Sequence, residues 1–272
     1  MGEAGDGGGG AGRCRHPHQC SGHAHTALGI ALIDERRNAP ALVHFRAAVK
    51  ADPNDKSLHL NLAEALTRDG QFDAALVEAR EAVRLDPDDP LSHRALGALL
   101  GRNHQPEASL QELQTAIRLQ PNNPQNKVLL GLEYAGMFGH MDEAVATLQQ
   151  AALADPNSVS ARSSLEKTEA LKVRVEAVLE RERARVHDHP NDPDAHARLA
   201  AAEARSGDLK AAIRDFQKVA ELRPDSGSPH LQLAEVYLAQ GDSNTAWEEV
   251  RKARALGSDP SAALMARLPV QK

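Results

Sequence analysis

Residues 53–87 read PNDKSLHLNLAEALTRDGQFDAALVEAREAVRLDP. In the first half, leucine recurs every four residues, which is the spacing of one face of an α-helix. Gly70 interrupts this pattern, because glycine readily adopts the positive φ that ends a helix. A second apolar face begins at Phe72, and Pro87 ends it because proline lacks an amide hydrogen. The stretch therefore predicts two short antiparallel helices joined by a tight turn.

The same pattern recurs along the chain. Prolines follow one another at gaps of 34, 34, 35, 34 and 34 residues: Pro53, Pro87, Pro121, Pro156, Pro190 and Pro224. Leucines keep the same rhythm: Leu28, Leu62, Leu96, Leu130, Leu165, Leu199 and Leu233. A period of this size is typical of stacked supersecondary units. The predicted fold class is all-α, an α-solenoid of stacked antiparallel helix pairs.

The composition excludes several classes of protein. Apolar residues make up 41% of the chain but aromatic residues only 3%, so the core must consist of Ala, Leu and Val. A net charge of -6 gives no basic face for nucleic acid. No apolar run approaches the ~20 residues of a membrane helix, so we expect no membrane insertion. The glycine-rich N-terminus does not resemble a secretory signal, which favours a cytoplasmic protein; export with a missing or cleaved signal is the alternative.

Small residues follow the leucine row at the next position: Gly29, Ala63, Gly97, Gly131, Ala200 and Ala234. With these residues the chain resembles the tetratricopeptide repeat family over residues 22 to 260. The resemblance implies a right-handed superhelix and the following organisation. We expect a disordered Gly/His/Cys-rich tail at 1–21, four repeat units at 22–158, an irregular segment at 159–192, two units at 193–260, and a short cap or tail at 261–272.

The segment 159–192 departs from the pattern. Glu166, Glu169, Glu182 and Arg185 occupy positions that are small or apolar in the other units, and no glycine interrupts its middle. Two interpretations remain open. The segment is either a degenerate repeat packed in register or one long charged helix that connects four repeats to two.

Residues with catalytic potential do not form recognisable motifs. The chain has no phosphate-binding loop, no zinc-protease motif and no nucleophile elbow, so we expect neither enzymatic activity nor a cofactor. Weak candidates for metal binding in the tail are Cys14, His16, His18 and Cys20, whose spacing matches no closed zinc module. A column of histidines stands three residues before the leucine row: His25, His59, His93, His196 and His230. We expect these to be half-apolar filler side chains, with one ring nitrogen reaching a backbone acceptor.

The resemblance also implies a binding groove. In the family, the first helix of each unit lines a concave surface that holds a peptide or a helix of another protein. The corresponding positions here are Thr26, Ile30, Leu60, Asn61, Glu64, Arg68, Arg94, Ala98, Arg102, Val128 and Leu132. Of the family's clamp for acidic chaperone C-termini only Asn61 is present, which disfavours that ligand.

The leading functional hypothesis is therefore a non-catalytic scaffold or adaptor that binds a peptide or amphipathic helix in this groove. A homo-oligomeric structural scaffold is the alternative, and metal binding by the Cys/His tail is a third hypothesis. The sequence leaves open the identity of the partner, the pathway and the oligomeric state.

Overall fold

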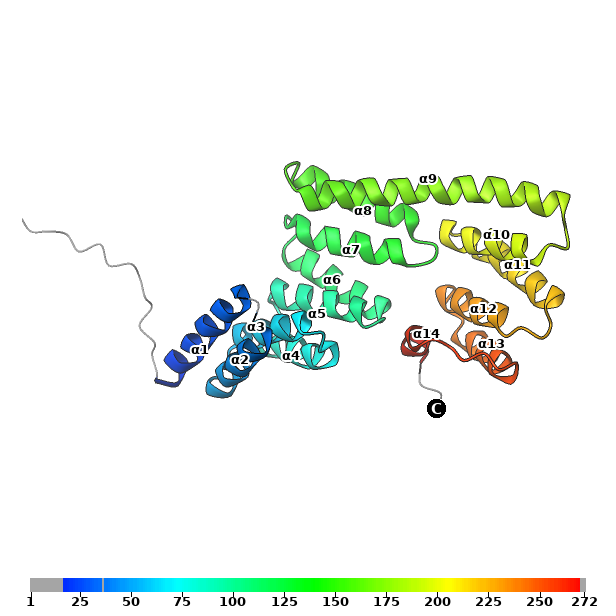
Figure 1. The fold of residues 1–272 in the computed structure, drawn as a ribbon. Coiled ribbons are helices and arrows are strands. Elements are labelled where there is room, and N and C mark those ends of the chain that lie inside the picture. The colour runs from blue at the N-terminus through cyan, green and yellow to red at the C-terminus, as the bar shows by residue number, and fades with distance from the viewer. Residues whose placement is uncertain (1–16, 36, 270–272) are drawn as a thin grey trace, which may run out of the picture. The chain divides into compact units, whose positions relative to one another are not determined.

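The chain is an array of helices (Figure 1). The computed structural model describes residues 17–35 and 37–269, with side chains from Ser21 onward. These residues form helices and no strands, and the helices pack in consecutive pairs, which confirms the predicted all-α solenoid. The chain divides into two compact units, one ending at Pro87 and the other beginning at Asp88.

Unit 1 contains two helical hairpins. Its helices are α1 (Pro17–Asp34), α2 (Asn38–Ala51), α3 (Lys56–Arg68) and α4 (Phe72–Leu85). The apolar face of α3 is buried, with Leu58, Leu62 and Leu66 each at most 3% exposed. Gly70 lies in the turn between α3 and α4 with a φ of 80°, the conformation for which the sequence selects glycine there.

Unit 2 contains four hairpins, one long helix and a short terminal helix. Its helices are α5 (Pro90–Arg102), α6 (Pro106–Leu119), α7 (Pro124–Gly136), α8 (Met141–Ala154), α9 (Val159–Asp188), α10 (Pro193–Ser206), α11 (Leu209–Leu222), α12 (Ser228–Ala239), α13 (Ser243–Ala255) and α14 (Ala262–Arg267). Leu264 and Leu268, in and after α14, pack against apolar residues of α12 and α13 and so cover the last hairpin.

At five of the six prolines of the row, the second residue after the proline caps the next helix; after Pro224 the N-cap is Gly227, which makes no side-chain hydrogen bond. Asp55, Asp89, Asn123 and Asp192 accept hydrogen bonds from backbone N–H groups in the first turns of α3, α5, α7 and α10. These bonds satisfy donors that have no partner inside the helix. The short Pro-Asn or Pro-Asp segments of the sequence thus end one hairpin and begin the next.

Most of the leucine row lies in the core, but Leu165 is half-buried and Leu28 is exposed. Leu62, Leu96, Leu130, Leu199 and Leu233 are 2% to 7% exposed, whereas Leu28 is 47% exposed. The expectation of a buried leucine is therefore wrong for Leu28. It belongs to the first hairpin, and no earlier hairpin of the described chain lies against it.

The glycines beside the leucine row permit close packing of the two helices in a hairpin. A Cβ added to Gly97 would lie 2.8 Å from Cγ of Leu113, and one added to Gly131 would lie 2.6 Å from Cγ of Leu148. Both leucines are fully buried. Glycine at these positions therefore makes room for a large side chain of the second helix.

We expect Gly131→Val to lower the free energy of unfolding by roughly 1 to 3 kcal/mol, because the new methyl groups overpack against Leu148. Urea denaturation followed by circular dichroism measures this change. Gly136→Ala is the matched control in the same helix, since nothing lies within 4 Å of its added Cβ. We expect this control to be neutral or stabilising by up to about 1 kcal/mol. A stable Gly131→Val protein would contradict the packing described here.

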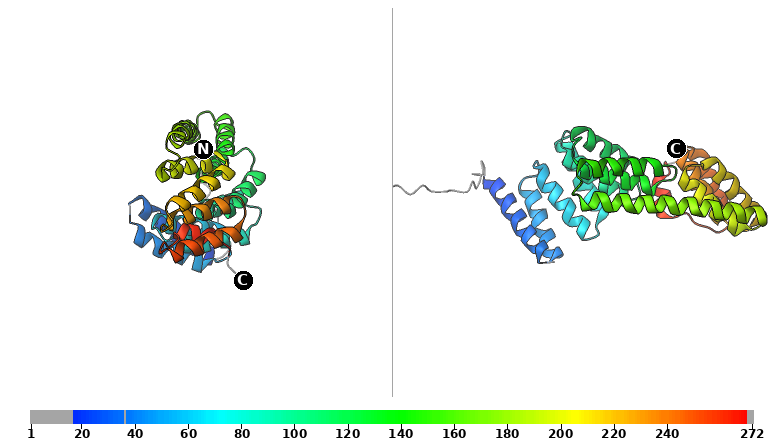
Figure 2. Two further views of the ribbon diagram at one scale, coloured as in Figure 1. Left: turned by 90° about the vertical axis from the view of Figure 1, so that its right-hand side faces the viewer. Right: turned by 90° about the horizontal axis from the view of Figure 1, so that it is seen from above.

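The segment 159–192 contains one helix and no internal turn. α9 is 30 residues long. The right-hand view of Figure 2 shows it as one unbroken helix. Its first half places Ala161 in a cluster with Val128 and Leu148. Its second half places Val175 and Leu179 in a cluster with residues of α10. One helix therefore packs on the α7–α8 hairpin with one half and on α10 with the other.

A buried carboxylate strengthens the junction of α9 with α10. Glu182 is 1% exposed, and its oxygens lie 2.8 Å from Nε of Arg181 and 3.3 Å from Nε of Arg198 on α10. Although burial alone raises the pKa of a carboxyl group, the two guanidinium groups lower the pKa of Glu182 below its ordinary value. Glu182 is thus ionised and serves as the polar link between the two helices.

Unit 2 closes on itself. Phe138, in the loop between α7 and α8, packs against the apolar cluster of α10, α11 and α12. In the same loop, Gly139 lies so close to Gly207 that a Cβ added to it would be 3.7 Å from the Cα of Gly207. Arg267 donates to Oε1 of Glu107 at 3.0 Å, although 160 residues separate them. Because α9 connects the two stacks, the last hairpins reach back to α6 and the α7–α8 loop.

Candidate functional site

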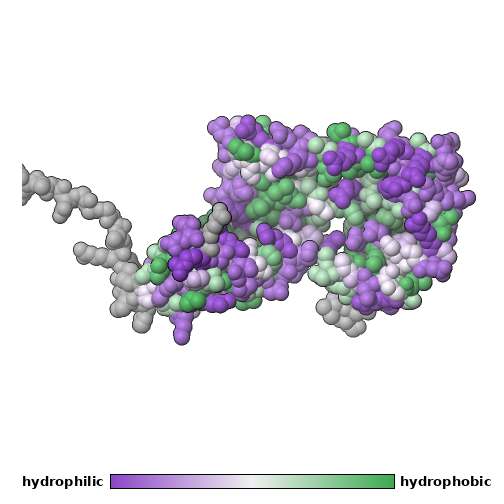
Figure 3. Space-filling view, in the orientation of Figure 1, coloured by the Kyte–Doolittle hydropathy of each residue, from purple (hydrophilic) through white to green (hydrophobic). Residues whose placement is uncertain are grey.

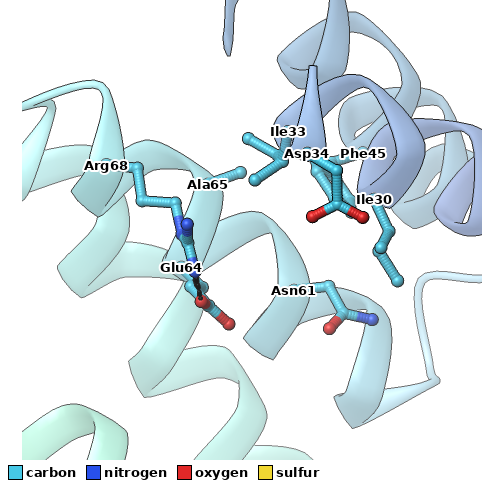
Figure 4. Close-up of a pocket in the computed structure, with 8 residues that line it drawn as sticks. All are labelled: Ile30, Ile33, Asp34, Phe45, Asn61, Glu64, Ala65 and Arg68. Carbon is cyan, nitrogen blue, oxygen red and sulfur yellow. Dashed lines mark hydrogen bonds and ion pairs between the residues drawn. The ribbon is translucent and has the colours of Figure 1, made fainter. Parts of the chain in front are cut away.

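Unit 1 contains a hollow of about 250 Å³ between its first three helices (Figure 4). Its lining is contributed by α1, α2 and α3: Ile30, Ile33, Asp34, Phe45, Asn61, Glu64, Ala65 and Arg68. Four of the residues that the sequence predicts for a groove, Ile30, Asn61, Glu64 and Arg68, thus lie around one cavity.

Helical periodicity explains why the residues of α3 reach the same hollow. Asn61, Glu64 and Arg68 follow each other at intervals of three and four residues and so lie on one face. Nη2 of Arg68 donates to Oε1 of Glu64 at 2.6 Å, and both side chains are more than half exposed. Such an exposed pair contributes less than about 1 kcal/mol to stability, so a ligand can compete for either partner.

The floor of the hollow is apolar. Phe45 on α2 is 3% exposed, and its ring lies across Gly29 of α1, where an added Cβ would be 2.9 Å from Cζ. Ile33 and the buried Ala65 complete the apolar part of the lining. Beside them Ile30 is 49% exposed, so a large aliphatic side chain next to the cavity keeps half of its surface in contact with water.

The rim of the hollow is charged. Asp34 and Glu64 contribute carboxylates, and Arg68 contributes a guanidinium group already paired with Glu64. Within the described part of the chain, Asp34 has no ion-pair partner. The hollow therefore combines an apolar floor with an excess of negative charge at its edge.

The lining residues that the sequence reasoning missed have recognisable signals. Ile33 and Asp34 follow Ile30 by three and four residues, so they share its helix face. Phe45 belongs to the second helix of the hairpin, which the family pattern does not assign to the groove. The ring of Phe45 can reach the floor of the hollow because Gly29 has no side chain in its way.

Two predicted residues of unit 1 lie away from the lining. The hydroxyl of Thr26 donates to the carbonyl oxygen of Gly22 at 3.1 Å. Leu60 is half-buried on α3 and does not line the hollow.

In unit 2 the predicted residues have different exposures. Arg94 and Ala98 on α5 are half-buried, and Arg102 is exposed. Leu132 on α7 is 45% exposed, and Figure 3 shows apolar side chains gathered over this helix. These four residues are accessible to solvent.

Val128 is an exception, because it is 1% exposed. It packs with Leu148, Ala151 and Ala161, the last of which belongs to α9. The long helix thus covers the position that faces a ligand in regular repeats. Val128 cannot contact a ligand in this arrangement, and its expected place in the groove is corrected accordingly.

The histidine column forms a repeated buried contact. In four of the five rings Nδ1 donates to a carboxylate 19 residues later, in the pairs His59–Glu78, His93–Glu112, His196–Asp215 and His230–Glu249. Nε2 of His59 and of His196 also donates to the carbonyl oxygens of Pro53 and Pro190, both at 3.0 Å. The predicted backbone acceptor is present for these two rings. The carboxylate partners were missed, although the constant spacing of 19 residues is visible in the sequence.

One carboxyl group near this column has an unusual environment. Glu203 on α10 is 5% exposed, and its Oε2 is buried without a hydrogen-bond partner. Burial first, and then the carboxylate of Asp215, raise the pKa of Glu203 to about 8. Asp208 also raises this pKa, while Arg183 on α9 lowers it. The protonation of Glu203 therefore bears on the stability of the folded protein.

The tail residues considered for metal binding, Cys14, His16, His18 and Cys20, lie outside the residues whose side chains the structure describes. Among the described side chains, no three His, Cys, Asp or Glu residues converge as metal ligands. None of the described helices is long and apolar enough to span a bilayer.

Comparisons with known proteins agree with the repeat pattern of the sequence. Two family models described as tetratricopeptide repeat match the sequence, one over residues 32–99 and 203–268 and the other over residues 174–229. No curated protein matches the sequence.

Among solved structures, a tetratricopeptide repeat protein from Parabacteroides merdae is similar with a TM-score of 0.50 and 17% identity, over 92% of this chain and 98% of the other. PilF from Pseudomonas aeruginosa is similar with a TM-score of 0.47 and 16% identity, over 89% of this chain and 94% of PilF. TTC0263 from Thermus thermophilus is similar with a TM-score of 0.45 and 21% identity, over 80% of this chain and 99% of TTC0263. At these identities the similarity concerns the fold alone.

Proposed function

Since this chain belongs to the tetratricopeptide repeat family, we propose that it is a non-catalytic adaptor whose hollow in unit 1 binds an amphipathic segment of another protein. The fold of this family generally serves protein–protein interaction. The specific site and ligand chemistry proposed here come from the residues around the hollow.

The observation that carries this proposal is the exposed Ile30 beside the apolar floor formed by Phe45. Removing apolar surface from water contributes about 25 cal/mol per Å². A ligand side chain that enters the hollow covers Ile30 and fills space above Ile33 and Ala65. An apolar anchor of the ligand, such as Leu or Phe, is therefore the main source of affinity.

The charged rim specifies what flanks this anchor. Asp34 has no ion-pair partner in the described structure, and the carboxylate of Glu64 can exchange Arg68 for a cation of the ligand. Charge complementarity therefore favours a Lys or Arg within one helical turn of the ligand's apolar anchor. An acidic peptide would face these two carboxylates and bind weakly.

The exposed residues of unit 2 are a second proposed contact surface. Arg94, Ala98 and Arg102 lie on α5, and Leu132 lies on α7. Their mixture of apolar and cationic groups suits an amphipathic segment that carries carboxylates.

The partner can be identified with a photo-crosslinking amino acid placed at Asn61 in the native cell, followed by mass spectrometry of the attached protein. A crosslinker at Val43 serves as the control, because that residue is 64% exposed on α2 and does not line the hollow. The proposal requires a protein that is captured from Asn61 and not from Val43. Identical capture from both positions contradicts a binding site at the hollow.

We expect Ile30→Asp to weaken binding of the identified segment about 10- to 30-fold, since a loss of 1.4 kcal/mol corresponds to a factor of ten. Fluorescence anisotropy with a labelled peptide measures the dissociation constant. Val43→Asp introduces the same charge at another exposed aliphatic residue and should leave the constant unchanged. Equal losses in both variants would point to a general charge effect and against the site.

A further inference from the structure

The first repeat departs from the histidine–carboxylate pattern. In the other repeats of the column the partner 19 residues after the histidine is Glu78, Glu112, Asp215 or Glu249. The corresponding partner of His25 is His44. The first repeat therefore pairs two imidazole rings, whereas the four other pairs combine an imidazole ring with a carboxylate.

The two rings face each other through the same type of atom. Nδ1 of His25 on α1 lies 3.1 Å from Nδ1 of His44 on α2. The ring centroids are 5.4 Å apart, so these nitrogens form the facing edges of the rings. Both side chains are half-buried, which leaves one side of the pair accessible from solvent.

We propose that His25 and His44 form a binding site for a divalent transition-metal ion of the Zn²⁺, Cu²⁺ or Ni²⁺ class. Neutral imidazole nitrogen is the ligand that these ions prefer in proteins. Zinc binds such nitrogens at about 2.0 to 2.1 Å, and a tetrahedral angle then separates the two nitrogens by about 3.3 Å. The observed 3.1 Å differs from this separation by about 0.2 Å. Because the two Nδ1 atoms point at each other, both rings must rotate by about 35° to direct their lone pairs at the ion.

A metal ion can replace the hydrogen bond between the two rings without the loss of a proton from either ring. In the metal-free pair one ring donates through its Nδ1–H and the other accepts with its Nδ1 lone pair. When that donor ring carries its proton on Nε2 instead, both Nδ1 lone pairs are available to the ion. The two rings remain neutral, and the bound ion replaces the shared hydrogen atom between them.

The remaining coordination positions belong to water. No third His, Cys, Asp or Glu joins the pair among the described side chains. With two protein ligands the site has one fewer than the three of a typical open zinc centre, so it binds the ion more weakly and leaves most of its coordination positions to water. Its precision comes from the packing of α1 against α2, which fixes both histidines on rigid helices.

Isothermal titration of the full-length protein without an affinity tag, using Zn²⁺, Cu²⁺ and Ni²⁺ salts in a non-chelating buffer, tests this proposal. His44→Glu restores the histidine–carboxylate pair found in the other repeats, so the variant should fold normally. We expect it to bind one equivalent of metal less than the wild type, or to bind that equivalent with a dissociation constant at least tenfold higher. Thermal unfolding by circular dichroism verifies the fold of the variant. A His44→Glu protein that binds metal as the wild type does overturns the proposal.

Two further variants distinguish this site from the cysteines and histidines of the tail. The combined change Cys14→Ser, His16→Ala, His18→Ala and Cys20→Ser should retain the equivalent bound by His25 and His44. Glu78→His creates a second pair with His59, and we expect it to add one equivalent. Loss of all metal in the tail variant, or no gain in Glu78→His, contradicts the assignment.

Discussion

Replacing Val173 with proline lowers the free energy of unfolding of unit 2 by about 3 kcal/mol or more. Val173 is 65% exposed near the middle of α9, so the substitution removes almost no buried contact. The effect comes from the backbone, because proline lacks the amide hydrogen and its ring clashes with the preceding turn. A break at this point separates the half of α9 that packs on α7 and α8 from the half that packs on α10.

The position of Val173 makes the experiment decisive. It corresponds, three repeats later, to Gly70, which lies in the turn between α3 and α4. If residues 159–192 formed a hairpin like the other repeats, this position would lie in a turn with positive φ, where glycine is favoured. Val173→Gly therefore separates the two structures, because in the continuous helix it costs about 1 kcal/mol relative to alanine. Val173→Ala is the matched control and should be neutral or slightly stabilising, because alanine favours helix. Chemical denaturation followed by circular dichroism compares these variants with the wild type.

The second large effect is a loss of stability as the pH rises. The pKa of Glu203 is raised to about 8 in the folded protein, whereas that of an unfolded chain stays at its ordinary value of 4.5. Between these two values the folded state binds more protons than the unfolded state, so ionisation of Glu203 favours unfolding. At about 1.4 kcal/mol per pKa unit, the contribution of this group falls by roughly 3 to 5 kcal/mol from pH 4.5 to pH 9.

Glu203→Gln separates this contribution from those of other groups. The amide cannot ionise and can donate to Asp215, so we expect the variant to be more stable than the wild type above pH 8. Below pH 5 the two should be similar. Glu180→Gln, at an exposed position of α9, is the control and should leave the pH dependence unchanged. Urea titrations at pH 5, 7 and 8.5 provide the comparison; parallel curves for wild type and Glu203→Gln would rule out the buried protonated carboxyl group.

Local features of the fold were predictable because each depends on a few neighbouring residues. The turn at Gly70, the cap at Asp55 and the packing of Leu148 on Gly131 follow from backbone freedom, hydrogen bonding and side-chain volume. The burial of Leu28 failed because burial needs a covering neighbour, and the first hairpin has none on that side in the described chain.

The candidate site was predictable only in part. Ile30, Asn61, Glu64 and Arg68 could be placed because they lie on the first helices of consecutive repeats. Val128 was misplaced because the family pattern assigns its position to the groove, whereas in this chain Ala161 at the start of α9 and residues of α8 bury it.

Other contacts required knowledge of which helices meet. The pair formed by His25 and His44 was visible as a departure from a regular spacing of 19 residues, once that spacing is known to bring two side chains together. No local signal indicates that Arg267 meets Glu107, because helix-by-helix reasoning describes only adjacent hairpins.

The closure of unit 2 has a consequence for how quickly the chain folds. In an open array each hairpin touches only its neighbours, so structure can nucleate anywhere and spread. In unit 2, Phe138 must pack against an apolar cluster whose residues lie between positions 200 and 236, and Glu107 must pair with Arg267. Contacts between such distant residues require the closing of long loops, which slows the final step of folding. During synthesis, the first hairpins of unit 2 can form on the ribosome, but the contact between Glu107 and Arg267 can form only after residue 267 has left the ribosome.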